Sequence, residues 1–515
     1  MKHKYVDLDA KGKAVYLYTY DEAEQKPKRA KQVLWGDWLM VDEGHDYNKI
    51  GAGWTAIVWA PKTKREIYYI KNEHTTDTRP LEIIFLDVGQ GDGAVLITPE
   101  DDQNEKIIVI DAGEGGNMAT FLNGRFKAYR GFNFEAAVIT HPDQDHYLGF
   151  KDIFADHKIG FKTIYQNGLV ERPVSGTFEK LGGIMEDPVT GDFYIENLAT
   201  NKADIETHFS DDSAFGRKKF PPVMFNALNN PKIKDFRMLS IDAEHSVHKN
   251  GKAYMPNFQP EPSASYTIEV LGPVVEYDDN NKPRLKRISS NYGKTKNGHS
   301  IILKLYYGKY KVLFGGDLNV PAEKYLLQHY AQLESFPGKA NPNYQVMLNK
   351  GAEWFRSEIM KVCHHGSDKV TDEFMKVVNP ACFVISSGDE EGHVHPRPDL
   401  LGRLGKFGRG KSPVILSTEL QRSTREFEDA KKVEQLKKQI DELVDTEEPS
   451  EDFINSVKEN ISHLGRTNVD VYGAVYLKTD GERLITAFKF EENSDKKKWF
   501  YYEYKIDDDG ELQLS

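Results

Sequence analysis

At 515 residues, the chain is too long for one ordinary hydrophobic core, and this length predicts roughly two to four domains. The net charge of -12 argues against a broadly basic nucleic-acid platform, and no stretch approaches the about 20 apolar residues of a membrane helix. With two cysteines, Cys363 and Cys382, and no secretory signal at its start, the sequence predicts a cytoplasmic protein without a disulfide framework.

Residues 1–75 predict a small SH3-like β-barrel domain. Short β-favouring runs alternate there with turns, and a polar linker over residues 74–80 ends in a proline. Four of the six tryptophans lie in this part of the chain, namely Trp35, Trp38, Trp54 and Trp59. They allow two interpretations, a ligand cage or the completion of a thin core, and the size of the domain favours the core.

Residues 81–515 predict a second, larger domain. Its first strands are expected over residues 81–88, 94–98, 107–110 and 136–139, with a helix over 118–126. Between 171 and 296 the periodic pattern fades into sequence rich in Gly, Pro and Asn, with one clear strand over 266–271. We therefore expect a large insertion over the functional site, either a lid or a substrate-selecting element.

Regular patterns return in the second half of the chain. Strands are expected over residues 300–305, 310–314, 358–362, 382–385, 469–477, 483–490 and 498–506. Within a helical insertion over about 422–465, apolar residues from Val433 to Leu443 repeat at spacings of three, four and three. This pattern predicts an amphipathic helix that forms a hairpin with residues 453–461 and packs on the core, while its apolar seam is the alternative, a surface for a protein partner.

The segment THPDQDH at residues 140–146 predicts a metal-binding loop. Zinc and manganese bind imidazole nitrogen and carboxylate oxygen. Alternate positions of an extended chain point the same way, so His141, Asp143 and Asp145 can converge while His146 turns in beside them. One such loop can supply ligands to two metal ions. Taken alone, the segment also fits an aspartate that caps a helix among charged neighbours.

Three later clusters supply what a two-metal site would need. Asp317 follows a predicted strand in the sequence FGGD, where its carboxylate can bridge two cations. His364 and His365 follow another strand in CHHGS, and His299 precedes a third in NGHS. Because strands that end on one edge of a sheet gather their loops, these side chains are expected to share one pocket with the metal-binding loop.

The order HPDQDH, GHS, GGD and CHHGS resembles the metallo-β-lactamase fold, an αββα sandwich of the α+β class. Most members of that fold have a histidine where this chain has Asp143. This departure, DVGQGDG at residues 87–93, the pair Asn297 and Ser300, and GHVHP at 392–396 are similar to the metallo-hydrolase domain of ComEC-type DNA-uptake proteins. The resemblance covers about residues 81–415, without the membrane channel of full ComEC proteins.

The resemblance implies two divalent metal ions, Mn or Zn, as cofactors, and Asp143 shifts the preference toward manganese. The implied metal ligands are His141, Asp143, Asp145, His146, Asp317 and His364, with His299 as a further candidate. The implied catalytic residues are Asp145, His365 and His395. Positioning or substrate-binding roles would fall to Asp92, Asp111, Asn297, Ser300 and Ser367.

The implied reaction is hydrolysis of a phosphodiester by a water activated between the two metals, most readily in a nuclease acting on DNA or RNA. A bacterial defence effector, or a nuclease restrained by a partner bound to the barrel or to the helix near Val433, fits this activity. Hydrolysis of a lactone, amide, thioester or cyclic nucleotide would use the same metals. A metal-stabilised binding module is the remaining alternative, and the intact ligand set favours an enzyme.

Overall fold

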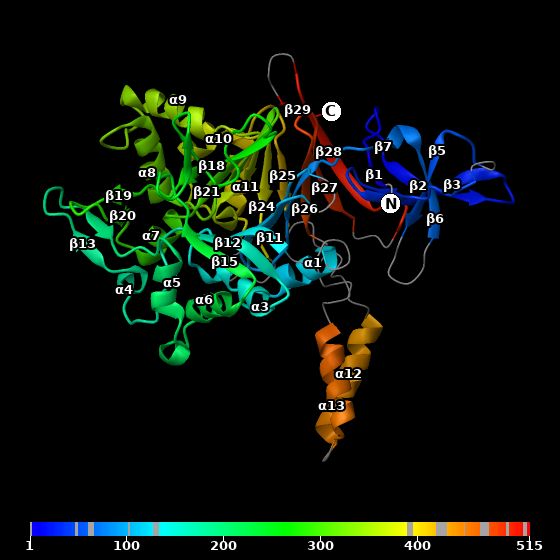
Figure 1. The fold of residues 1–515 in the computed structure, drawn as a ribbon, viewed down its shortest axis with the longest axis horizontal. Coiled ribbons are helices and arrows are strands. Elements are labelled where there is room, and N and C mark those ends of the chain that lie inside the picture. The colour runs from blue at the N-terminus through cyan, green and yellow to red at the C-terminus, as the bar shows by residue number, and fades with distance from the viewer. Residues whose placement is uncertain are drawn as a thin grey trace.

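The computed structural model describes residues 3–46, 50–59, 66–100, 104–126, 133–388, 395–418, 430–446, 449–463, 473–490, 494–507 and 512–514. Within these ranges the chain has a mixed α+β architecture, with sheets of seven, ten, four and eight strands (Figure 1). None of the helices in these ranges is both long enough and apolar enough to cross a bilayer.

The seven-stranded sheet contains the first strands of the chain. They are β1 (His3–Val6), β2 (Val15–Asp21), β3 (Lys26–Val33), β4 (Trp38–Val41), β5 (Trp54–Trp59), β6 (Glu66–Lys71) and β7 (Thr75–Thr76), with a 3-10 turn at Asn72–His74. Their order is β3-β2-β6-β5-β4-β1-β7. β3 and β7 are therefore edges, and strand pairing within the described ranges does not close the barrel that the sequence predicts.

The tryptophans of this region divide between the two interpretations. Trp35 is 2% exposed and packs into the core of the larger part of the molecule. Trp38 is 44% exposed. Trp35 is therefore a core residue, but of the larger region and not of the thin core of the N-terminal sheet, and the core interpretation is wrong for Trp38, whose side chain lies largely in solvent.

The ten-stranded sheet joins the two ends of the larger region. Its strands are β8 (Leu81–Phe85), β9 (Gly93–Ile97), β10 (Ile107–Ala112), β11 (Asn133–Val138), β12 (Gly160–Gln166), β15 (Ile233–Met238), β26 (Val475–Thr479), β27 (Leu484–Lys489), β28 (Trp499–Ile506) and β29 (Leu512–Leu514). β26 pairs antiparallel with β8, so the last strands of the chain extend the sheet that the first ones begin.

The eight-stranded sheet contains the middle of the chain. Its strands are β16 (Val247–Lys249), β17 (Lys252–Tyr254), β18 (Tyr266–Gly272), β21 (Ile302–Tyr307), β22 (Tyr310–Phe314), β23 (Ile359–Lys361), β24 (Cys382–Ile385) and β25 (Val414–Ser417). β22, β23, β24 and β25 run parallel, so their carboxyl ends meet at one edge of the sheet.

The two large sheets pack face to face, and helices cover their outer faces (Figure 1). α1 (Asn117–Phe126), α3 (Phe150–Ala155), α5 (Lys202–Phe209) and α6 (Phe220–Asn229) lie on the ten-stranded sheet. α8 (Val320–Ala331), α9 (Asn343–Phe355), α10 (Asp372–Val378) and α11 (Pro398–Phe407) lie on the other. β8 and β9 are buried on both faces, which explains their continuous apolar sequences.

The segment 171–296, predicted as one insertion, is divided among several layers. β15 extends the ten-stranded sheet, β16 to β18 belong to the eight-stranded sheet, and α5 and α6 cover the core. The remainder forms the four-stranded sheet β13-β14-β20-β19. The strands of this sheet are β13 (Ile184–Glu186), β14 (Phe193–Ile195), β19 (Glu276–Tyr277) and β20 (Pro283–Lys286). Helix α4 (Phe178–Leu181) precedes them in the chain, and α7 (Tyr292–Gly298) follows them.

The predicted helical hairpin is present as α12 (Ala430–Asp445) and α13 (Glu451–His463), but it does not pack on the core. The two helices lie side by side and project away from the sheets in Figure 1. Leu436 and Val457 are buried, whereas Val444 is 77% exposed. Among the described side chains of the hairpin, Leu436 and Val457 are therefore buried, while Ile440 joins Val444 in being exposed.

Candidate metal centre

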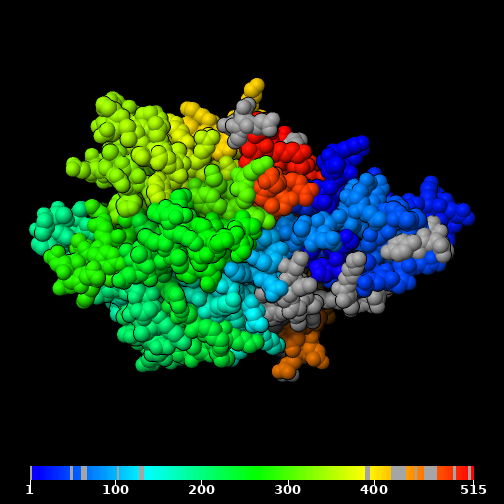
Figure 2. Space-filling model, turned by 45° about the horizontal axis from the view of Figure 1, so that its top comes forward, coloured from blue at the N-terminus to red at the C-terminus, as the bar shows by residue number. Residues whose placement is uncertain are grey.

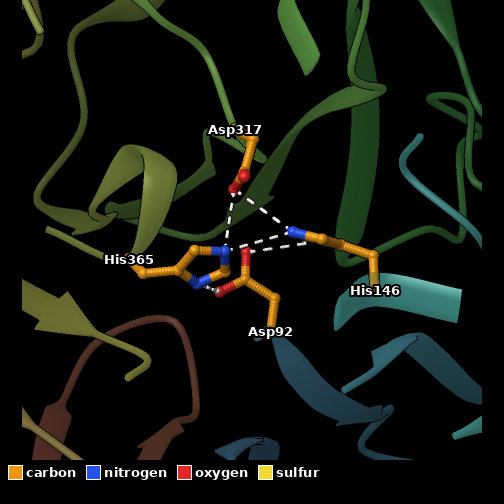
Figure 3. Close-up of side chains that lie close together, drawn as sticks. All are labelled: Asp92, His146, Asp317 and His365. Carbon is orange, nitrogen blue, oxygen red and sulfur yellow. Dashed lines mark hydrogen bonds and ion pairs between the residues drawn. The ribbon is translucent and has the colours of Figure 1, made fainter. Parts of the chain in front are cut away.

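Strand ends from both large sheets meet in one buried group of side chains. Asp92, His146, Asp317 and His365 each offer a ligand atom, and these atoms lie within 4.8 Å of one another (Figure 3). Asp92 lies just before β9, His146 lies in α2 (Gln144–Tyr147), and the other two follow β22 and β23. Residues from distant parts of the sequence therefore share one pocket, as the strand-end clusters predict.

Two imidazoles of this group face one carboxylate oxygen. Nε2 of His146 and Nε2 of His365 lie 3.3 and 3.4 Å from Oδ1 of Asp317, and 3.2 Å from each other. Oδ1 of Asp317 is buried and makes no hydrogen bond to the described residues. Two nitrogens and one oxygen that face the same point form a donor set suited to a zinc or manganese ion.

A contact to Nδ1, the ring nitrogen that faces away from Asp317, fixes the orientation of His146. Its Nδ1 lies 2.8 Å from Oδ2 of Asp111, and Asp111 accepts hydrogen bonds from the backbone and the hydroxyl of Thr140 at 2.8 and 2.7 Å. Asp111 has a φ of +53°, a left-handed conformation that side chains rarely adopt. This carboxylate fixes the ring so that Nε2 faces Asp317, the usual role of a carboxylate behind a metal-binding histidine.

His141 is fully buried and points one nitrogen at the same pocket. Its Nδ1 lies 3.1 Å from Oγ1 of Thr140 and 3.3 Å from Oγ of Ser300. Its Nε2 lies 3.9 Å from Oδ2 of Asp317 and has no hydrogen-bond partner in the described part of the chain. A buried polar atom without a partner costs free energy, and a bound cation would satisfy Nε2.

The two aspartates of the loop face different neighbours. Asp145 lies 3.4 Å from Nε2 of His365 and 3.9 Å from Nε2 of His146. Asp143 caps α2 by accepting a hydrogen bond from the backbone of Gln144, and its Oδ1 also lies 3.1 Å from Nζ of Lys296. Asp143 therefore has the helix-capping role that the sequence allowed as an alternative, at the edge of the pocket.

The CHHGS segment turns sharply after β23. His364 and His365 both have a φ of 52°, so two consecutive non-glycine residues adopt the left-handed conformation. Strained backbone of this kind concentrates at functional sites. Nε2 of His364 lies 3.9 Å from Oδ2 of Asp317, whereas the Ser367 hydroxyl accepts a hydrogen bond from the backbone of Lys369 within the loop.

Asn297 and Ser300 support the carboxylates and His141. The Ser300 hydroxyl donates to the carbonyl of Asn297 at 2.6 Å and accepts a hydrogen bond from the backbone of Asp317 at 3.0 Å. In one orientation of its side-chain amide, the nitrogen of Asn297 lies 3.3 Å from Oδ2 of Asp317. In the opposite orientation the nitrogen donates to Asp143 at 3.1 Å. Both residues therefore contact side chains of the pocket, and the positioning role that the resemblance implies stays a prediction.

His299 and His395 lie outside the group of four. Nε2 of His299 lies 2.7 Å from the carbonyl oxygen of Lys286, so the structure places this histidine away from the other ligand candidates. The His395 ring centroid lies 6.0 Å from that of His364 and 6.5 Å from that of His365, next to the pocket. Residues 392–394 of the predicted GHVHP motif lie outside the described ranges.

Two contacts around the pocket were not predicted from the sequence. Nζ of Lys361 contacts Oδ2 of Asp92, and both side chains are buried. Nδ1 of His365 lies 3.0 Å from Oδ1 of the same Asp92, which brings Asp92 into the group itself rather than only behind it. A lysine inside the apolar strand Ile359–Lys361 is the signal that could have revealed the first contact.

The charges of the pocket depend on one another. Burial would lower the pKa of His146, but Asp317 and Asp111 raise it well above its usual value. Burial would raise the pKa of Asp317, but His365 and His146 hold it well below its usual range. Burial lowers the pKa of His141, which leaves this imidazole neutral. A neutral imidazole with a buried, unpartnered nitrogen can coordinate a metal without first losing a proton.

Comparisons with known proteins find no protein-family model that matches the chain and no match among curated proteins.

Proposed function

We propose that the chain is a metal-dependent hydrolase that cleaves phosphodiester bonds in DNA or RNA, on a metallo-β-lactamase fold similar to the ComEC-type metallo-hydrolase domain. One observation carries this proposal. Ligand atoms from three separate motifs, represented by His146, Asp317 and His365, converge in one buried pocket. Two packed sheets with helices on both outer faces support the choice of fold.

The donor set fits divalent cations. Imidazole nitrogen and carboxylate oxygen are its only donor types, and Nε2 of His141 and Oδ1 of Asp317 are buried without hydrogen-bond partners in the described residues. The residues that would hold the ions are Asp92, His141, Asp145, His146, Asp317, His364 and His365. When bound, two such ions would lower the pKa of a water molecule and neutralise charge on the phosphoryl oxygens.

The side chains around the pocket supply no competing nucleophile and leave a side from which the substrate can approach. Burial raises the pKa of Cys363 well above its usual value, so this neighbouring thiol stays protonated and does not attack. His364, whose side chain is 27% exposed, and His395 next to it lie where a substrate can approach. Because His364 would hold a metal ion, His395 is the imidazole that can donate a proton to the leaving oxygen of a phosphodiester.

The test is cleavage of linear and circular DNA, RNA and a chromogenic phosphodiester by protein loaded with manganese or zinc. Asp145→Asn and His141→Ala should lose activity, while the exposed controls Asp152→Asn and His157→Ala, both outside the pocket, should keep it. Absence of metal-dependent cleavage of every phosphodiester, or equal cleavage by all four variants, would refute the proposal.

A further inference from the structure

A cavity of about 430 Å³ lies between the N-terminal sheet and β28, and shares no residue with the candidate metal centre. Figures 1 and 2 place the first strands of the chain beside its last strands. Gln32 joins the two walls. Its amide nitrogen donates to the carbonyl of Trp499 at 2.9 Å, and its oxygen accepts from the backbone of Lys498 and Trp499 at 2.6 and 2.9 Å. Hydrogen bonds therefore join the two walls of the cavity.

The cavity lining has an excess of positive charge. The cationic side chains of the lining are Lys31, Arg79, Arg125 and Lys498, and its carboxylates are Asp37 and Asp495. The lining therefore has an excess of 4 − 2 = 2 positive charges. The chain as a whole has a net charge of -12, so this local excess is opposite in sign to the rest of the molecule. A positive cavity in an acidic protein selects an anionic ligand.

The ion pairs of the lining leave one cation available. Lys31 lies 2.5 Å from Asp495, Arg125 lies 2.9 Å from Glu82 behind the wall, and Arg79 lies 3.5 Å from Glu105. Lys498 forms no ion pair with any residue in the described ranges, although its side chain lines the cavity. An ammonium group in this position can bind a phosphate directly.

Aromatic side chains line the same cavity. Tyr5, Trp38 and Trp499 contribute to its walls. Trp38 is 44% exposed, with its indole stacked against His3 at 6.1 Å between ring centroids. An exposed tryptophan beside cations stabilises the core little, whereas aromatic faces next to cationic groups bind bases that carry phosphates.

We propose that this cavity binds a nucleoside phosphate, with the base stacked on Trp38 and the phosphate at Lys498. Its volume lies within the roughly 300–1,000 Å³ of small-ligand sites. A free mononucleotide and the end of a single strand of nucleic acid offer this same chemistry. The site goes beyond the proposed hydrolase activity, because it needs no metal and uses none of the residues of the metal centre.

The test is isothermal titration calorimetry of the full chain in a metal chelator, with AMP, a five-nucleotide single-stranded DNA and inorganic phosphate as separate ligands. Trp38→Ala should weaken AMP binding about tenfold or more, because stacking of one base contributes roughly that factor. Lys498→Gln should weaken it about tenfold through loss of the phosphate contact. The exposed neighbour Lys496→Gln, which does not line the cavity, is the matched control.

The results distinguish a free nucleotide from the end of a nucleic-acid strand, and both from the absence of a nucleotide site. Binding of AMP as tight as that of the oligonucleotide identifies a free nucleotide as the ligand, and tighter oligonucleotide binding identifies a strand end. Both results support the proposal if Trp38→Ala weakens binding. Absence of AMP and oligonucleotide binding, equal binding of inorganic phosphate, or variants that bind like the wild type would overturn it. The chelator keeps this result independent of the metal-dependent cleavage test.

Discussion

The candidate metal centre and the buried ion pairs around Glu82 differ in the partners of their carboxylates. Glu82 is 3% exposed, with Lys478 at 3.5 Å and Arg125 at 2.9 Å. Burial would raise the pKa of Glu82, but Lys478 and Arg125 lower it to about 2. Asp317 has imidazoles as its nearest partners, and its Oδ1 makes no hydrogen bond in the described ranges.

This difference separates a structural charge cluster from one built for a ligand. Lys and Arg carry permanent charges, so the cluster around Glu82 is neutralised by the protein itself. Imidazoles carry a charge only when protonated, so Asp317 depends on protons or on a bound cation, whereas Asp92 also has the ammonium group of Lys361. Substitutions in the first cluster should therefore affect stability, and substitutions in the second should affect metal content.

The largest effect is expected for Asp317→Asn. The amide cannot bridge cations as a carboxylate does, so we expect metal content to fall from two ions to less than one per chain. kcat/KM for a chromogenic phosphodiester should fall at least about a hundredfold, since even residues behind metal ligands contribute factors of 10–100. Elemental analysis and steady-state kinetics measure both. Full metal content in this variant would remove Asp317 from the ligand set.

Lys478→Met should leave metal content unchanged and destabilise the protein. It removes the cation 3.5 Å from a buried carboxylate and the hydrogen bond of Lys478 to the carbonyl of Trp35. Arg125 stays 2.9 Å from Glu82, so we expect part of the about 3 kcal/mol that a fully uncompensated buried charge costs. Chemical denaturation should show this loss, and the double variant Glu82→Gln/Lys478→Met should recover part of it. A double variant less stable than the single one would contradict this account of the cluster.

Glu323 is a third case, a buried carboxylate that forms no ion pair with a residue in the described ranges. Its side chain accepts a hydrogen bond from the backbone of Thr371, and burial raises its pKa from 4.5 to about 8. The folded state therefore binds the proton more tightly than the unfolded state. The stability that this proton contributes is complete below pH 4.5 and is lost as the pH rises to 8, at about 1.4 kcal/mol per pH unit.

Glu323→Gln should remove this contribution to the pH dependence. Unfolding free energies measured at intervals from pH 5 to 8 should fall less steeply in the variant than in the wild type, with about 1.4 kcal/mol per pH unit separating the slopes. Glu334→Gln, in a surface turn after α8, is the matched control and should keep the wild-type slope. Parallel curves for wild type and Glu323→Gln would show that Glu323 is ionised in the folded protein.

Much of the fold follows from local sequence patterns. The bounds of β22 and β24 match the strands predicted over residues 310–314 and 382–385, because short apolar runs bounded by turns leave a signal within a few residues. β15, with the sequence IKDFRM, was missed because three charged residues interrupt its three buried ones without regular alternation in so short a strand. The insertion was consequently predicted to be larger and less integrated than it is.

The candidate site was predictable where its residues are close in sequence. His141 and His146 lie in one short loop, so spacing alone suggested that they converge. The contact between Lys361 and Asp92 joins positions 269 residues apart, and no local pattern specifies it. The surface against which a helical hairpin packs also depends on contacts that are distant in sequence, because the apolar seam around Leu436 could face either the core or the second helix.

The smallest effect is expected for His299→Ala, which tests the boundary of the metal centre. Nε2 of His299 bonds the carbonyl of Lys286 rather than facing Asp317, so the variant should retain full metal content. Loss of this buried hydrogen bond should cost about 1 kcal/mol of unfolding free energy. His141→Ala is the matched comparison, because its Nε2 lies 3.9 Å from Asp317 and should be needed for metal. Loss of one metal ion per chain in His299→Ala would instead make His299 a ligand, and the centre would then include the segment after α7.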